Sequence, residues 1–291
     1  MTKQYFLSIQ SCVSYGHVGN SAITFPLQRL GAEVYPIHTV LFSNHTGYGA
    51  WKGSIVDLGT VKEVFSGLKE RGVLSHVSCL LTGYMGSAEL GHVMLEALWE
   101  LKNINPNFIY CCDPVMGDVG RGFFVKPEIP AFFRDELIKH ATIITPNHFE
   151  LEYLCGRKLP TLQDVVQASR ELISKGTQIV LTTSVIDHSD EKKPDSLREI
   201  HVVAVSHSSA HMLTTPFLPA HLNGTGDLTS ALFSYFYSAT RSVPTALEEA
   251  ISRVYAVIQN THQGASRELL LVNSQNEIVE PPVYFKAESI A

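Results

Sequence analysis

The stretch LNGTGDLTSALFSYF, residues 222–236, places two glycines and a threonine directly ahead of an aspartate and an apolar helical pattern. Its apolar residues recur at the spacing of one buried helix face, made of Leu228, Ala231, Leu232, Tyr235 and Phe236. Glycines allow backbone N–H groups to turn inward, and a helix N-terminus adds roughly half a unit of positive charge. The stretch therefore predicts either a capped tight turn or an anion-binding site at the start of a helix.

Short apolar segments alternate with amphipathic segments along the rest of the chain. Strands are predicted at residues 5–10, 32–40, 76–81, 108–112, 141–144 and 178–183. Their nearly continuous apolar character is typical of parallel strands that are buried on both faces. Residues 199–206 and 210–216 are predicted to form an antiparallel pair at the edge of the sheet.

Helices are predicted between these strands. Residues 87–102 carry one apolar stripe, made of Leu90, Met94, Leu98 and Leu101. Pro244 marks the start of another helix, whose stripe in residues 246–258 is made of Leu247, Ala250, Ile251, Val254 and Ile258. The alternation predicts an α/β fold with a mostly parallel central sheet and helices on both faces. Because no linker divides the chain, residues 1–291 are predicted to form a single domain.

Composition and charge argue against several classes of protein. The formal net charge is −6 and no Lys/Arg-rich run occurs, so nucleic acid is not expected as a partner. No apolar run reaches the roughly 18 residues of a membrane helix, and the first ten residues are typical of a strand rather than a signal peptide. The five cysteines include no CxxC pair, so reduced thiols in a cytoplasmic protein are expected. Cys111 and Cys112 would lie on opposite faces of one strand.

Polar residues follow several of the predicted strands. Ligands of open α/β sheets bind beyond the carboxyl ends of the strands, so these residues are candidates for a site. Ser11 lies at the end of the first strand, ahead of a loop with Gly16 and Gly19. That loop is either a binding loop or a simple turn in which Asn20 or Ser21 caps the next helix. It lacks the GxGxxG spacing of a dinucleotide-binding fold.

Two carboxylate groups follow later strands. Asp113 begins the run DPVMGD, residues 113–118, and is either a Mg²⁺ ligand or part of a turn. After the next strand, the spacing of Asn147 and Glu150 predicts a capping box at a helix start. The same two groups are also suited to ordering metal-bound water.

The position of Asp227 suggests chemistry as well as structure. Gly224, Thr225 and Gly226 would form an anion hole without any lysine, and no GxxxxGK[ST] loop occurs. At a helix start the ionised form of Asp227 is expected to be favoured, so it would accept a hydrogen bond from an incoming hydroxyl group. A base with a low pKa suffices for a loose phosphoryl-transfer transition state, in which positioning dominates. The chain has no GxSxG elbow, and its 13 histidines form no HExxH motif.

Six segments resemble, in order and spacing, the pyridoxal kinases of the ribokinase-like superfamily: SIQSCVSYGHVGNSA, FSNHTGYGAWKG, LTGYMGS, CDPVMGD, ITPNHFELE and NGTGD. The resemblance covers essentially the whole chain, and FSNHTGY followed by GTGD is specific to this family rather than to sugar kinases. It implies a ribokinase-like fold and ATP-dependent phosphorylation of the 5′-hydroxymethyl group of pyridoxal, giving pyridoxal 5′-phosphate in vitamin B6 salvage. It also implies Mg²⁺ with a monovalent cation such as K⁺, and a homodimer.

The same resemblance implies roles for individual residues. Asp227 would be the base, with Gly224, Thr225 and Gly226 as the anion hole. The substrate would be bound by Ser11, His45, Thr46, Gly47, Tyr84 and Asp227. The nucleotide would be bound by Asp113, Asp118, Thr145, Asn147, Glu150, Thr183, Ser184, Ala220, His221, Leu222 and Asn223, and the metal by Asp113 and Glu150. Some bacterial members carry a basic residue close to Thr183, whereas hydroxyl groups alone are expected to contact phosphate here.

Three loops have a composition that suggests a place outside the core. Loop 42–57 offers Phe42, Tyr48 and Trp51 to a flat pyridine ring and is expected to close over the substrate and exclude water. The glycine-rich run 117–122 is expected to act as a second flap. Residues 187–198 are strongly polar and are expected to form a solvated excursion between strands.

Two other functions stay open. A hydroxymethylpyrimidine kinase has the same fold and anion hole but phosphorylates a thiamine precursor, and the SNHTGY segment argues against it as the principal activity. A non-catalytic protein that stores or delivers pyridoxal phosphate is the alternative from another class. Asp227 and its glycines argue against that alternative, because binding alone needs no base at the transferring oxygen.

Overall fold

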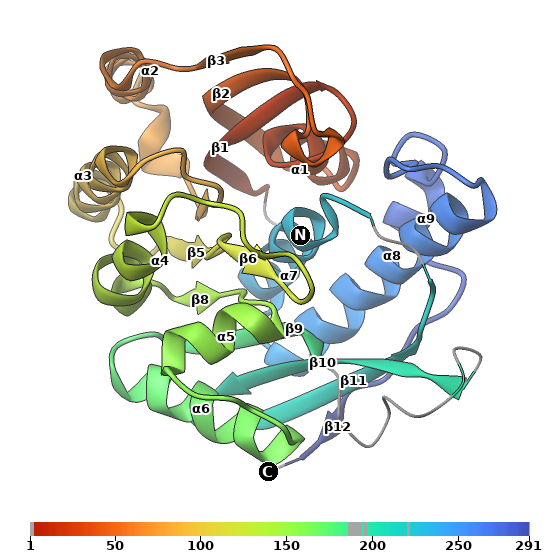
Figure 1. The fold of residues 1–291 in the computed structure, drawn as a ribbon. Helices are drawn as coiled ribbons and strands as arrows, with labels where there is room; N and C mark the ends of the chain where they lie inside the picture. Colours follow the sequence, from red (N-terminus) through yellow and green to blue (C-terminus); the bar gives the residue numbers. More distant parts are fainter. Residues whose placement is uncertain (1–2, 186–193, 195–196, 220–221, 291) are drawn as a thin grey trace.

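The computed structural model describes residues 3–185, 194, 197–219 and 222–290, and a ten-stranded sheet lies at its centre (Figure 1). The order across the sheet is β12-β11-β10-β9-β8-β5-β4-β1-β2-β3. The strands are β1 (Tyr5–Tyr15), β2 (Glu33–Asn44), β3 (Gly53–Ile55), β4 (Cys79–Thr82), β5 (Ile109–Cys112), β8 (Ile143–Ile144), β9 (Ile179–Val185), β10 (Glu199–Ser206), β11 (Ala210–Pro216) and β12 (Glu288–Ser289). A separate hairpin is made of β6 (Gly117–Asp118) and β7 (Gly122–Phe123).

The middle of the sheet is parallel. Strands β2, β1, β4, β5, β8 and β9 pair in parallel register, while β3, β10, β11 and β12 add antiparallel strands at the two sides. The antiparallel pair β10–β11 is confirmed, although the two-residue strand β12 pairs with the outer side of β11 and forms the edge. Because the parallel strands share one direction, their carboxyl ends meet at the same side of the sheet.

Two layers of helices cover the sheet (Figure 1). One layer contains α1 (Asn20–Arg29), α7 (Thr225–Thr240), α8 (Val243–Gln263) and α9 (Gln275–Val279). The other contains α2 (Leu58–Glu70), α3 (Ala88–Ile104), α4 (Glu128–Phe132), α5 (His148–Cys155) and α6 (Leu162–Ser174). Short helical turns are η1 (Thr46–Tyr48), η2 (Val73–His76), η3 (Phe133–Leu137) and η4 (Ile138–His140). The predicted α/β architecture with helices on both faces is therefore confirmed.

Each face of the sheet has its own apolar core. The predicted helix stripes point into these cores: Leu90 and Met94 of α3 lie in one, and Leu228 and Leu232 of α7 lie in the other. The neighbouring cysteines of β5 divide between the two cores, as the alternation of side chains along a strand predicts. All five cysteines are free thiols.

The first strand is longer than predicted. The chain from residue 12 to Tyr15 continues β1, because it pairs with residues 41–44 of β2 after an irregularity at Gln10 and Cys12. Ser11 therefore lies within the strand, and the start of the predicted loop 42–57 belongs to β2. The predicted polar excursion at 187–198 lies almost entirely outside the described residues.

The predicted cap of α1 is wrong. Gly19 occupies the cap position, and among the described residues no side chain accepts a capping hydrogen bond there. The side chain of Asn20 instead accepts a bond from Ser8 Oγ at 2.7 Å and donates to the carbonyl of Ile37 at 3.0 Å. Asn20 is buried, and its side-chain amide bonds polar groups of β1 and β2 rather than backbone N–H groups at the start of α1.

Within the described part of the chain, no helix has both the length and the apolar character that crossing a membrane requires.

Candidate active site

A pocket of about 200 Å³ lies where the carboxyl ends of the parallel strands face the start of α7. Nearly all of the predicted site residues line it: Ser11, His45, Thr46, Tyr84, Asp113, Asp118, Thr145, Asn147, Glu150, Thr183, Ser184, Leu222, Asn223, Gly224, Thr225, Gly226 and Asp227. Gly47 is not among the lining residues, and Ala220 and His221 lie outside the described residues. The topology thus brings together segments that lie as far apart in the sequence as Ser11 and Asp227.

Gly47 shapes the loop that borders the pocket. Its N–H donates to Nδ1 of His45 at 3.1 Å, which caps the short turn η1. A methyl group at residue 47 would lie 2.8 Å from that same nitrogen. The residue therefore holds His45 and Thr46 in place at the pocket without lining it.

The start of α7 requires glycine at position 224. Gly224 is the cap residue, with φ of +86°, and a Cβ there would lie 1.8 Å from the carbonyl oxygen of His17. Of the described residues, none caps α7 with its side chain. The first N–H groups of a helix have no partner within it, so residues 225–227 present donors at the pocket. The helix start is therefore uncapped, with free donors at the pocket, rather than a capped turn.

Asp227 is the third residue of α7, so its carboxylate does not cap the helix. The backbone N–H of Gly19 donates a hydrogen bond to this carboxylate and lowers its pKa, but burial raises the pKa further, to about 6. The expectation of a low pKa is therefore wrong, because loss of water outweighs the favourable helix end. A carboxylate with this pKa is a stronger base than an exposed aspartate.

Asp113 lies close to the other carboxylates of the pocket floor. It is buried, and Ser230 Oγ donates to Asp113 Oδ2 at 3.0 Å while also contacting Thr145 Oγ1 at 2.7 Å. Burial together with the charges of Glu150 and Asp227 raises the pKa of Asp113 well above its usual range. These carboxylates crowd one another in a region with little water, where a cation would be stabilised.

Glu150 forms the predicted capping box with Asn147. Asn147 Oδ1 accepts the N–H of Glu150, and Glu150 Oε2 accepts the N–H of Asn147, both at 2.9 Å. Glu150 Oε1 also accepts the N–H of Met116 at 2.9 Å. Burial nevertheless raises the pKa of Glu150 to about 8. The residue therefore holds the loop after β5 against the start of α5.

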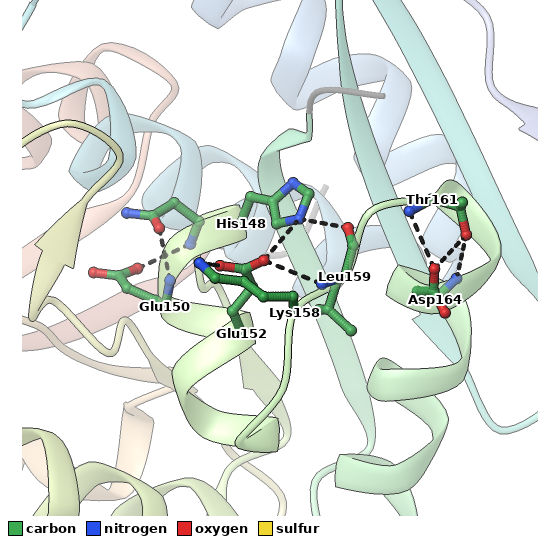
Figure 2. Close-up of polar contacts among 8 residues, drawn as sticks. His148, Glu150, Glu152, Lys158, Leu159, Thr161 and Asp164 are labelled. Atoms are coloured by element: carbon green, nitrogen blue, oxygen red, sulfur yellow. Dashed lines mark hydrogen bonds and ion pairs between the residues drawn. The ribbon is translucent and has the colours of Figure 1, made fainter. Parts of the chain in front are cut away.

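Figure 2 shows the polar contacts of α5 and of the loop that follows it. Glu150 lies at its first turn, and a separate set of contacts joins His148, Glu152 and Lys158 beside the following loop. His148 Nε2 lies 2.9 Å from the carbonyl of Leu159, and Glu152 accepts the N–H of Leu159 at 3.1 Å. These bonds join His148 and Glu152 of α5 to the loop that follows the helix, next to the turn that carries Glu150.

The glycine-rich run that was predicted as a second flap forms the β6–β7 hairpin, from which Gly117, Asp118 and Arg121 line the pocket. Gly117 and Phe123 pair at its base, where Asn147 Nδ2 donates to the carbonyl of Gly117 at 2.8 Å and the ring of Phe123 contacts Phe149 and Tyr153. Arg121 lines the pocket and donates to Oδ1 of Asn223 at 3.4 Å. The sequence interpretation missed Arg121, although a lone cation in a glycine-rich loop after Asp113 was a signal for it.

A second cavity of about 170 Å³ adjoins the first. Thr183, Ser184, Leu222, Thr225 and Gly226 line both. Its remaining walls come mostly from β10, β11 and α8, with Thr229 of α7 and Leu218 after β11, and are mainly apolar: Ile200, Val202, Thr215, Pro216, Leu218, Thr229, Ile251, Val254, Tyr255 and Ile258. The sequence interpretation did not predict this cavity, because its apolar wall residues have the same pattern as the buried faces of a helix and two strands.

Ser184 sits between the two cavities in an uncommon conformation. Its φ is +52°, in the left-handed region that residues other than glycine seldom adopt. The preceding residue, Thr183, forms a bridge with Asn147 that continues the pairing of β8 and β9. Thr183 and Ser184 near the end of β9 thus line the pocket with an uncommon backbone conformation, of the kind that often occurs at functional sites.

Comparison with known proteins agrees with this geometry. The family model for phosphomethylpyrimidine kinase matches residues 67–269. The pyridoxal kinase PdxY of Rubrobacter xylanophilus is 46% identical over 98% of this chain and 97% of its own length. The pyridoxal kinase PdxY of Corynebacterium diphtheriae is 42% identical over 98% of this chain and 99% of its own.

Solved structures of pyridoxal kinases also resemble this chain. The pyridoxal kinase of Leishmania donovani in complex with ADP and pyridoxine superposes with a TM-score of 0.90, at 28% identity over 99% of both chains. Its complex with ADP and pyridoxamine gives a TM-score of 0.89, at 29% identity over 99% of this chain and all of that one. The likeness extends over both helical layers and the whole sheet.

Proposed function

The chain belongs to the pyridoxal kinases of the phosphomethylpyrimidine kinase family, which transfer a phosphoryl group from ATP to pyridoxal, and we propose which residues perform the transfer. Asp227 is the base that accepts the proton of the 5′-hydroxyl group, and Gly224, Thr225 and Gly226 form the anion hole. The observation that carries this proposal is the start of α7, where an uncapped helix end and a half-buried carboxylate with a pKa of about 6 face one pocket.

The pyridine ring is proposed to bind on the side of the pocket nearest β1 and β2. Val13, Val18, Val40 and Phe42 supply apolar walls there, and Tyr84 lines the same space. Ser11, His45 and Thr46 supply polar groups for the ring substituents. This combination of apolar walls with a few polar groups suits a flat heterocycle whose orientation must be fixed.

The nucleotide is proposed to occupy the other side of the pocket and the adjoining cavity. The apolar walls from β10, β11 and α8 suit an adenine ring, and Thr183 and Ser184 lie between the cavities, where phosphate or ribose would pass. The transferring phosphoryl group would then lie over the N-terminus of α7, where helix dipole and free N–H groups stabilise its charge. Asp118 and Asn223 line the pocket beside this position.

The carboxylates of the pocket floor fit Mg²⁺. Asp113 follows β5, and Glu150 lies in the first turn of α5, after the adjacent strand β8. Burial above all raises the pKa of each carboxyl group, and a cation beside them would lower it. In the described residues, no three His, Cys, Asp or Glu side chains form a ready-made metal cage. Mg²⁺ keeps several waters and binds through one or two carboxylates plus phosphate oxygens, so two such groups suffice. When bound, the ion neutralises phosphate charge during transfer.

Further parts of the proposal concern the assembly and the ions. A monovalent cation such as K⁺ supports turnover, which replacement of K⁺ by tetramethylammonium would test.

The chain is proposed to form a single domain and a homodimer, since Leu41, Trp51 and Ile55 are exposed beside the edge strand β3. Light scattering after size exclusion measures the dimer. A cytoplasmic location is proposed because the cysteines are free thiols.

The test of substrate is a pair of reactions. Purified protein is incubated with ATP, Mg²⁺ and pyridoxal, and pyridoxal 5′-phosphate is followed by absorbance, with hydroxymethylpyrimidine in the parallel reaction. Product from pyridoxal is expected. Product mainly from hydroxymethylpyrimidine would show that a pyrimidine is the substrate, as the name of the phosphomethylpyrimidine kinase family suggests. Absence of both products would overturn the proposal.

The pH dependence of turnover is expected to follow Asp227. A protonated carboxyl group cannot accept the hydroxyl proton, so activity is present above the pKa of about 6 and lost below it. We expect kcat/KM for pyridoxal to fall roughly tenfold per pH unit on the acid side. The residual kcat/KM of Asp227→Asn should not show this fall at acid pH. Any pH dependence that arises from the titration of ATP itself would remain in the variant.

Arg121 is expected to supply the positive charge that Thr183 and Ser184 lack. Its guanidinium lies beside Asn223, next to the anion hole, and phosphate is the ligand that such a group binds best. Arg121→Ala should lower kcat/KM for ATP roughly 10- to 100-fold, as loss of a charge-assisted bond predicts. Arg121→Lys should recover part of this loss. Arg134→Ala, which removes an exposed guanidinium paired with Asp135, is the control. Equal values for both alanine variants would contradict the role.

A further inference from the structure

Glu268 joins two loops that border the active site, although it does not itself line the pocket. It follows α8 and is 8% exposed. Oε1 accepts a hydrogen bond from the hydroxyl of Tyr48 at 2.5 Å, and Oε2 accepts the N–H of His17 at 3.0 Å. We call these two bonds the Glu268 link.

The segment that carries Glu268 is held firmly. Leu269 and Leu271, which closely follow Glu268, are buried in the core beneath α7 and α8. Ser266 Oγ donates to the carbonyl of Glu268 at 2.7 Å and accepts its N–H at 3.1 Å. The carboxylate therefore projects from a fixed support toward the two loops that carry Tyr48 and His17.

The first of these loops carries substrate-side groups. Tyr48 ends η1, the turn that contains Thr46 and is capped by His45, and both of these neighbours line the pocket. The ring of Tyr48 lies 4.6 Å from the guanidinium carbon of Arg267 and contacts Tyr15 edge-on. The carboxylate raises the pKa of the Tyr48 hydroxyl to about 12, which keeps that hydroxyl a donor.

The second loop, residues 16–19, holds the catalytic end of the site. Gly19 donates its N–H to Asp227, and the carbonyl of His17 lies against Gly224. Gly16 has no room for a side chain, since a Cβ there would lie 2.1 Å from Oε2 of Glu268. Because Gly16 has no side chain, the carboxylate of Glu268 can reach the backbone N–H of His17.

We propose that Glu268 is a positioning residue, which fastens the loop of His45 and Thr46 to the loop that supports Asp227 and so keeps the pyridoxal side of the site closed. This rests on the proposed function of the pocket. Because Tyr48 supports only the substrate side, losing the link affects pyridoxal more than ATP. The walls of the adjoining cavity come mostly from β9, β10, β11 and α8, whereas the two bonds of the link join Glu268 to Tyr48 and His17.

The experiment compares Tyr48→Phe and Glu268→Ala with the matched control Tyr15→Phe. Tyr15 contacts Tyr48 through its ring, so loss of its hydroxyl leaves the link intact. Both link variants should raise KM for pyridoxal roughly 10-fold, with KM for ATP within about twofold of the parent. The double variant should be no worse than Glu268→Ala, because both changes remove the same bond. A parental KM for pyridoxal in Tyr48→Phe would overturn the proposal.

Hydrogen exchange supplies a readout that needs no activity. Peptides spanning residues 45–50 should exchange faster in Tyr48→Phe and Glu268→Ala than in Tyr15→Phe, with pyridoxal and ADP present. Unchanged exchange in both link variants would refute the link even if the enzyme had another substrate. Failure of the parent protein to phosphorylate pyridoxal would instead refute the proposed function. Tyr48→Phe keeps the ring and its packing, so the test survives if Glu268→Ala does not fold.

Discussion

Asp227→Asn is expected to lower kcat for pyridoxal roughly 100- to 10,000-fold, the usual contribution of a positioned general base. Asparagine keeps the shape of the side chain and can still accept the N–H of Gly19 through its amide oxygen, so the loop of residues 16–19 should stay in place. What the amide cannot do is accept the proton of the substrate hydroxyl. Binding of pyridoxal and ATP should therefore change far less than turnover.

The measurement is kcat from steady-state kinetics, together with calorimetric affinities for pyridoxal and for ATP. Asp164→Asn is the matched control, because Asp164 is also the third residue of its helix, α6, and lies in an exposed capping box. It should turn over pyridoxal like the parent protein. If kcat of Asp227→Asn stayed within about threefold of the parent, far less than a general base contributes, Asp227 would not be the base.

The elements that the sequence predicted well are those in which burial dictates residue type. The strands at the centre of the sheet are buried on both faces, and their apolar runs are visible without knowledge of the fold. The end of β1 was missed because Ser14 and Tyr15 are exposed. Their strand conformation depends on pairing with β2 rather than on their own side chains. The cap of α1 was missed because Asn20 satisfies buried strand groups instead.

Some residues of the pocket, such as Tyr84 and Thr183, were predicted only from the family resemblance, whereas Ser11, Asp113 and Asn147 were predicted from their places after strands. Polar groups that directly follow parallel strands must meet, since the topology brings the carboxyl ends together. Arg121 and Glu268 do not follow strands of the sheet, and their partners lie 102 and 220 residues away in the sequence. The pKa of Asp227 was misjudged because the helix start is a local feature, whereas burial arises from the whole fold.

Gly224→Ala is expected to reduce turnover roughly 100-fold or more, the cost of losing one donor of an oxyanion site, and to destabilise the protein. Alanine is disfavoured at a φ of +86°, and its methyl group would lie 1.8 Å from the carbonyl oxygen of His17. The backbone must shift to relieve that contact. Since Gly224 begins α7, the shift would turn the N–H groups of the anion hole away from the transferring phosphoryl group.

Gly226→Ala separates the backbone requirement from mere loss of a glycine. Residue 226 lies within α7, and a methyl group there meets no atom within 4 Å. Alanine is the better helix former by about 1 kcal/mol, so Tm should stay constant or rise. Gly224→Ala should lower Tm by roughly 5 °C, from strain and contact together. Equal Tm values for the two variants would show that position 224 tolerates a side chain. The anion hole would then not depend on a left-handed glycine at the start of α7.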